Sequence, residues 1–174
     1  HPDDGIYILL KEILDNAVDE FIMGCGKRID IAVAEDGCCR VRDYGRGIPL
    51  GKVVECVSVI NTGAKYNTEV FQFSVGLNGV GTKAVNALST RFVVTAFRDG
   101  HYKTATFAQG ILQHEEEGEA KEKNGTLVEF LPDPELFPAY QYDPQYVEQR
   151  LWRYAYLNAG LSLYLDGAHF FSKN

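Results

Sequence analysis

The chain has 174 residues, 45% of them hydrophobic, and a formal net charge of −7 at pH 7. This length and apolar content suffice for one well-buried core, so we expect a single domain. No apolar run approaches the roughly 20 residues that a membrane-spanning helix needs, and no signal-peptide pattern opens the chain. This negative net charge disfavours direct binding to nucleic acid, because proteins that bind the phosphates of nucleic acid usually carry a basic surface.

Hydrophobic periodicity divides the chain into helices and strands without any internal repeat. In chain order we predict a helix at residues 6–23, strands at 29–34 and 39–42, helices at 52–60 and 82–88, strands at 92–97, 102–108 and 126–131, a helix at 143–157 and a strand at 161–165. Residues 61–73 are predicted to be a polar loop, and the acidic run at 115–119 a solvated one. Hairpin turns are expected at Asp36-Gly37, Asp99-Gly100 and Asp166-Gly167. This order predicts an α+β sandwich with a largely antiparallel sheet.

Cysteine spacing indicates neither a metal centre nor a disulfide framework. The four cysteines, Cys25, Cys38, Cys39 and Cys56, contain no C-x-x-C pair, and the two adjacent ones would point to opposite faces of a strand. We therefore expect reduced thiols, as in a cytoplasmic protein.

The first predicted helix carries a polar stripe opposite its apolar face. Glu12, Asn16 and Asp19 are spaced i, i+4 and i+7, and no Lys or Arg between Glu12 and Met23 pairs with them. An asparagine inside a helix has poor helix propensity. The stripe alone fits a solvated surface. A carboxylate one turn before an amide oxygen also fits a general base beside a ligand for a hard cation.

Two glycine-rich segments follow. Asp43 ends a strand directly before Gly45 and Gly47, where a carboxylate either caps its own turn or accepts a hydrogen bond from the exocyclic amine of adenine, with the glycines leaving room for the ring. The segment at residues 76–81 has three glycines directly before a helix, so its bare N–H groups could hold phosphates. It is not a P-loop, because no Gly-Lys-Ser/Thr closes it.

Three motifs follow one another along the chain: E-x-x-x-N on a helix, then D-x-G-x-G, then G-x-x-G-x-G. With these motifs in this order, the sequence resembles the GHKL ATPase superfamily, whose Bergerat fold holds ATP. The strings at residues 12–20, 43–49, 76–89, 124–126 and 157–160 narrow the resemblance to the B subunits of bacterial type II topoisomerases, which drive a DNA gate in DNA gyrase and topoisomerase IV. The resemblance implies a two-layer α/β sandwich, with helices on one face of a mostly antiparallel mixed sheet.

The resemblance also implies roles for individual residues. Glu12 would be the general base that polarises the attacking water, Asn16 the Mg²⁺ ligand, and Asp43 the adenine-selecting carboxylate, helped by Thr126 and an ordered water. The other nucleotide-binding residues that it implies are Asp19, Glu20, Arg46, Gly47, Ile48, Pro49, Lys65, Gly76, Leu77, Asn78, Gly79, Val80, Gly81 and Arg98. The implied cofactors are ATP and Mg²⁺, and aminocoumarin-type inhibitors would bind in the same region.

Members of this family carry an N-terminal arm that secures an ATP-driven dimer and a transducer domain that supplies a lysine to the γ-phosphate. Residues 1–174 are accordingly expected to be one ATP-binding domain without these parts, mostly monomeric and slow in hydrolysis. The topoisomerase A subunit and DNA are the partners implied for the intact protein, in the cytoplasm and away from membranes.

Other members of the superfamily remain alternatives. A sensor histidine kinase would need a phosphoacceptor histidine on a preceding helical domain, which the positions of His1, His101, His114 and His169 do not suit. A mismatch-repair or chaperone ATPase, acting as a nucleotide-gated clamp, shares the expected fold. The strings at 43–49 and 157–160 favour the topoisomerase.

Overall fold

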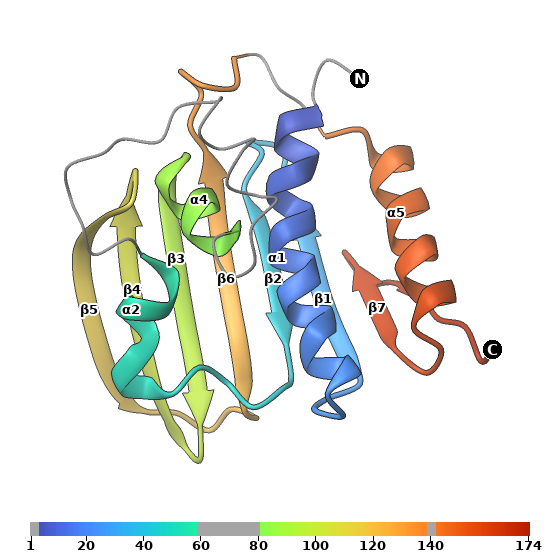
Figure 1. Cartoon of the computed structure of the whole chain (residues 1–174), viewed down its shortest axis with the longest axis horizontal. Coiled ribbons are helices and arrows are strands. Elements are labelled where there is room, and N and C mark those ends of the chain that lie inside the picture. Colours follow the sequence, from blue (N-terminus) through green and yellow to red (C-terminus); the bar gives the residue numbers. More distant parts are fainter. Residues whose placement is uncertain (1–3, 59–80, 139–141) are drawn as a thin grey trace.

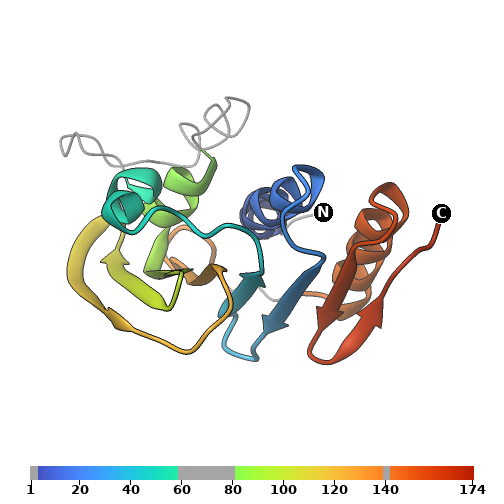
Figure 2. The ribbon, with the colours of Figure 1, turned by 90° about the horizontal axis from the view of Figure 1, so that it is seen from below.

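The computed structural model describes residues 4–58, 81–138 and 142–174. They form two layers, a single sheet and a set of helices that cover one of its faces (Figure 1). Seen from below, the sheet is curved, and all the helices lie on the same side of it (Figure 2). This arrangement confirms the predicted α+β sandwich with helices on one face.

The sheet has eight strands, and all neighbouring pairs are antiparallel except β1 and β7, which are parallel. Across the sheet the strands are β5 (Ile111–Glu119), β4 (His101–Ala108), β3 (Ser89–Arg98), β6 (Gly125–Pro132), β2 (Cys39–Asp43), β1 (Arg28–Val33), β7 (Ser162–Leu165) and β8 (Ala168–Phe170). The ends of β2 and β6 therefore lie side by side at the centre of the sheet, although they are far apart in sequence.

The helices are α1 (Asp4–Ile22), the 3₁₀ turn η1 (Leu50–Lys52), α2 (Val53–Val57), α4 (Gly81–Ala87) and α5 (Pro144–Leu157). Helix α1 lies over the middle of the sheet, with Ile6, Leu10, Ile13 and Ala17 each no more than 4% exposed. Its apolar face was predicted from the sequence. In the predicted polar stripe, Asn16 and Asp19 are exposed and Glu12 is half-buried.

The acidic run at residues 115–119 was predicted to be a loop, and this prediction was wrong. These residues belong to β5, which pairs with β4 at one edge of the sheet. Lys103 of β4 lies 2.9 Å from the Glu115 carboxylate, and Tyr102 donates a hydrogen bond to Glu116 at 2.8 Å. Cross-strand pairs of this kind offset the poor strand propensity of glutamate. Charged side chains also blunt a sheet edge against pairing with another chain.

Smaller differences concern element ends. The helix predicted at residues 52–60 is shorter, because α2 ends at Val57 and Ser58 is extended, with φ −131° and ψ 153°. Residues 59 and 60 lie outside the described part of the chain, as does the predicted loop at 61–73. Strand β8 was not predicted. The N-terminus of α5 was predicted. The helix begins at Pro144, and the side chain of the preceding Asp143 accepts a hydrogen bond from the Gln145 amide.

All four cysteines are free thiols. Across residues 4–58, 81–138 and 142–174, no helix has both the length and the apolar character that crossing a membrane requires.

Candidate active site

A cavity of about 400 Å³ lies between α1, α2 and the helix-covered face of the sheet. The adjoining ends of β2 and β6, at the centre of the sheet, contribute Asp43 and Thr126 to its lining. Nine of the residues that the sequence singled out line it: Asn16, Glu20, Asp43, Arg46, Gly47, Ile48, Pro49, Arg98 and Thr126. The fold thus brings residues from four distant segments into one cavity.

Asp43 is the buried charge of this cavity, with only 9% of its surface exposed. Its Oδ1 atom accepts hydrogen bonds from the Gly45 amide at 3.0 Å and the Thr126 amide at 3.1 Å. Burial raises the pKa of the carboxyl group to about 6, against the opposing effect of these two bonds. Both bonds use the same oxygen, so Oδ2 is left to receive a donor from a ligand.

The glycines after Asp43 serve the packing of the protein itself. We expected Gly45 to leave room for a ring, but that space is taken by Glu20, whose Cβ would lie 2.7 Å from a Cβ at position 45. Glu20 in turn accepts a hydrogen bond from Arg46 Nη2 at 2.9 Å. Gly47, with φ +78°, lies against the Phe97 carbonyl oxygen. Gly45 is therefore required because it lets α1 approach the turn.

Glu12 lies at the far end of the site. Together with Asp19 and Gly81 it lines an adjoining hollow of about 730 Å³, which shares Asn16, Cys56 and Thr82 with the first cavity. Burial raises the pKa of the Glu12 carboxyl group, Lys11 opposes this rise and Asp15 adds to it. A carboxylate with a raised pKa is a better proton acceptor, which suits a general base.

The first turn of α4 holds the polar stripe of α1 in place. A Cβ atom at Gly81 would meet the Glu12 carboxylate, so a larger residue there would displace that flexible side chain from its present position. The next residue, Thr82, accepts a hydrogen bond through its Oγ1 from Asn16 Nδ2. The predicted base and the predicted metal ligand thus contact neighbouring residues of the same turn.

Some predicted residues cannot be placed. Lys65, Gly76, Leu77, Asn78, Gly79 and Val80 lie outside the described residues.

Sequence reasoning did not single out the walls of the cavity, which are Ile13, Ala17, Val41, Cys56, Val57, Thr82 and Val128. A signal for two of them was present, since strand alternation puts Val41 and Val128 on the same sheet face as Asp43 and Thr126.

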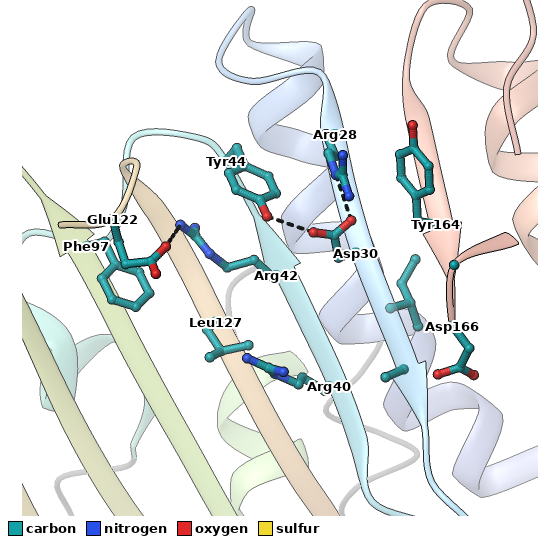
Figure 3. A pocket seen from close by; sticks show the side chains of 13 residues that line it. Arg28, Asp30, Arg40, Arg42, Tyr44, Phe97, Glu122, Leu127, Tyr164 and Asp166 are labelled. Carbon is teal, nitrogen blue, oxygen red and sulfur yellow. Dashed lines mark hydrogen bonds and ion pairs between the residues drawn. The ribbon is translucent and has the colours of Figure 1, made fainter. Parts of the chain in front are cut away.

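On the opposite face of the sheet, the side chain of Arg42 holds the backbone of Asp43. There Arg42, only 7% exposed, donates from Nη1 to the Asp43 carbonyl oxygen and from Nη2 to the Lys123 carbonyl oxygen at 2.7 Å. Its guanidinium lies between the rings of Tyr44 and Phe97, at 4.3 and 4.7 Å from their centroids (Figure 3). This contact ties the end of β2 to the segment that leads into β6, where the Thr126 amide is supplied.

Figure 3 shows that this cluster continues across the helix-free face. The Tyr44 hydroxyl donates to Asp30 at 2.7 Å, and Arg28 donates to the same carboxylate at 2.8 Å. Arg28 also lies over the ring of Tyr164, 4.1 Å from its centroid. The polar groups of this shallow hollow are largely paired with one another, which gives it a structural role behind the cavity.

Comparison with known proteins agrees with this geometry. The chain is 56% identical, over 99% of its length, to the B subunit of DNA topoisomerase 4 from Borreliella burgdorferi, of which it covers 28%. It is 43% identical to the B subunit of DNA gyrase from Thermus thermophilus, over 92% of this chain and 27% of that protein. It therefore spans about a quarter of the length of these curated relatives.

A solved structure shares the fold. The 43K ATPase domain of Thermus thermophilus gyrase B, in complex with an aminocoumarin, superposes with a TM-score of 0.77 at 39% sequence identity, over 98% of this chain and 47% of that one. Residues 2–135 match the family model described as histidine kinase-, DNA gyrase B- and HSP90-like ATPase. The resemblance inferred from the motifs is thus confirmed, and this chain belongs to the family of histidine kinase-, DNA gyrase B- and HSP90-like ATPases.

Proposed function

We propose that this chain is the ATP-binding and ATP-hydrolysing domain of a type II topoisomerase, from the B subunit of a gyrase or a topoisomerase IV. The observation that carries the proposal is the buried Asp43 carboxylate, held by two backbone amides on Oδ1 and facing the cavity. Keeping a carboxylate so poorly hydrated costs stability, so its presence in a cavity indicates a binding role. An adenine amine supplies the matching donor.

With adenine at Asp43, the phosphates extend toward Asn16 and Glu12, where the two hollows join. Asn16 offers one amide oxygen there, and the described residues contain no cluster of three or more His, Cys, Asp or Glu that could enclose a metal. This donor set fits Mg²⁺, which in nucleotide sites takes one or two protein oxygens and fills its shell with phosphates and water. When bound, Mg²⁺ neutralises charge on the phosphates.

Glu12 is the proposed general base. Its carboxylate orients the attacking water and accepts its proton as the bond to the γ-phosphate forms, while the leaving oxygen stays with ADP. The contact with Gly81 fixes the carboxylate against α4. Asp19, Glu20, Arg46, Gly47, Ile48, Pro49, Arg98 and Thr126 are proposed to shape the nucleotide site, and Lys65 and residues 76–81 to contact the phosphates.

The proposed partners beyond ATP are the topoisomerase A subunit and DNA, in the intact protein. The net charge of −7 makes a direct grip on DNA by this domain unfavourable. We infer that the domain contributes the nucleotide-driven step and that other parts of the protein bind DNA. The domain alone is proposed to be mostly monomeric.

Competition between nucleotide and an aminocoumarin tests this proposal. A non-hydrolysable ATP analogue is titrated calorimetrically into the protein with Mg²⁺, first alone and then at rising aminocoumarin concentrations. We expect the apparent Kd of the analogue to rise in proportion to inhibitor concentration, because the solved relative holds an aminocoumarin and shares this fold. An unchanged Kd at saturating aminocoumarin would contradict a shared site.

A further inference from the structure

Thr82 lies where the two hollows of the site meet, and its side chain contacts Asn16. It is half-buried in the first turn of α4, lines both hollows, and accepts the hydrogen bond from Asn16 Nδ2 across 66 positions of sequence. We infer that Thr82 is a positioning residue, which holds the Asn16 amide with its oxygen available to the Mg²⁺ of a bound nucleotide. This inference rests on the proposed function of Asn16.

The geometry of an amide gives this contact its effect. The nitrogen and oxygen of the Asn16 side chain diverge from its Cγ, so while Nδ2 donates to Thr82 the Oδ1 atom is directed away from the Thr82 hydroxyl. A cation needs the oxygen, and the flipped amide would present it with N–H groups instead. Because Asn16 is an exposed residue on α1, its side chain would otherwise sample several rotamers.

The surroundings of Thr82 make the contact a fixed one. The neighbouring Gly81 packs directly against Glu12, so the same turn of α4 touches two residues of α1 that lie one helical turn apart. Asn86 of α4 also donates from Nδ2 to the Val57 carbonyl oxygen at 2.9 Å, which ties α4 to the end of α2. The hydroxyl of Thr82 is therefore presented to Asn16 by a helix that is held on two sides.

Mg²⁺-dependent nucleotide binding tests the inference. Thr82→Val keeps the shape of the side chain and removes the acceptor, Thr82→Ser keeps the hydroxyl, and Thr90→Val is a matched control on an exposed threonine of β3. The Kd of a non-hydrolysable ATP analogue is measured by calorimetry in EDTA and across a Mg²⁺ titration. We expect Thr82→Val to reduce the gain in affinity from Mg²⁺ about tenfold, the scale of one hydrogen bond, and to change the Kd in EDTA by much less than this.

Thr82→Ser and Thr90→Val should both retain the wild-type gain from Mg²⁺. The inference is overturned if Thr82→Val shows the wild-type gain, or if Thr82→Ser is as weak as Thr82→Val. A merely structural role for Thr82 would weaken binding equally in EDTA and in Mg²⁺, and this result would overturn it too.

A double-mutant cycle separates positioning from direct contact. In an Asn16→Ala background, Thr82→Val should have no further effect, because the group that Thr82 positions is already gone. A further loss would mean that the hydroxyl touches the nucleotide or its metal directly, against the inference. If the wild-type protein itself binds no nucleotide, or binds it equally with and without Mg²⁺, the proposed function of the site fails first and the role of Thr82 falls with it.

Discussion

Replacing Glu12 with glutamine is expected to lower the rate of ATP hydrolysis by about 10²- to 10⁴-fold, the usual contribution of a general base. Nucleotide affinity should change little, since Glu12 lies in the hollow beside the main cavity and is assigned to the water. Glutamine keeps the size of the side chain against Gly81 and removes only its capacity to accept a proton. Single-turnover hydrolysis and a calorimetric Kd, measured on the same preparation, check the two halves of this expectation.

Glu148→Gln is the matched control, because Glu148 is an exposed carboxylate of α5 outside both hollows. It should hydrolyse ATP at the wild-type rate. A Glu12→Gln variant that loses affinity and turnover together would show that Glu12 binds the nucleotide, and the assignment of the base would be wrong.

Asp43→Asn is expected to weaken ATP binding by roughly 10- to 100-fold, since a hydrogen bond to a charged group contributes about 1.5–3 kcal/mol. Asparagine can still accept from the Gly45 and Thr126 amides through its oxygen. Its second atom then becomes an NH₂ group that faces the adenine amine, so a donor meets a donor. Calorimetric titration of a non-hydrolysable ATP analogue measures the loss.

The same substitution is expected to stabilise the protein at neutral pH. The folded pKa of Asp43, about 6, exceeds its ordinary value of 3.8, so the folded state holds the proton more tightly than the unfolded chain. Raising the pH from about 4 to about 6 therefore lowers the free energy of unfolding, by about 1–3 kcal/mol for this group. Asparagine is neutral at every pH, so burying it does not cost the free energy of burying a charge.

Urea unfolding at pH 7.5 and pH 4 checks the sign. Asp43→Asn should be more stable than wild type at pH 7.5, and the difference should shrink at pH 4, where the wild-type carboxyl group is protonated. A variant that is less stable at pH 7.5 would show that the negative charge itself stabilises the fold, contrary to its burial.

Local pattern was sufficient to predict much of the architecture, whereas the candidate roles of the site residues came from the resemblance of the motifs to a known family. The spacing of Ile6, Leu10, Ile13, Ala17 and Phe21 predicted the apolar face of α1; the first four are buried and Phe21 is half-buried. A strand that ends in a carboxylate before two glycines singled out Asp43, although this string alone fits a turn cap as well as an adenine acceptor. In both cases the signal lies within a few neighbouring residues.

Other features depend on contacts between distant segments, which pattern alone does not reveal. Residues 115–119 look like a solvated loop until Lys103 and Tyr102 of the next strand are beside them. Thr82 is an ordinary helix residue until α4 lies against Asn16. Arg42 reads as a surface residue of a strand, yet the connection that leads into β6 buries it.

The central claim is that the cavity at Asp43 selects adenine. Calorimetric titration of a non-hydrolysable ATP analogue and of the matching GTP analogue, both with Mg²⁺, tests it most directly. We predict clear binding of the ATP analogue and an affinity for the GTP analogue at least about tenfold weaker, because guanine presents a carbonyl oxygen where adenine presents its amine. Equal affinity for the two nucleotides, or none for either, would contradict the account.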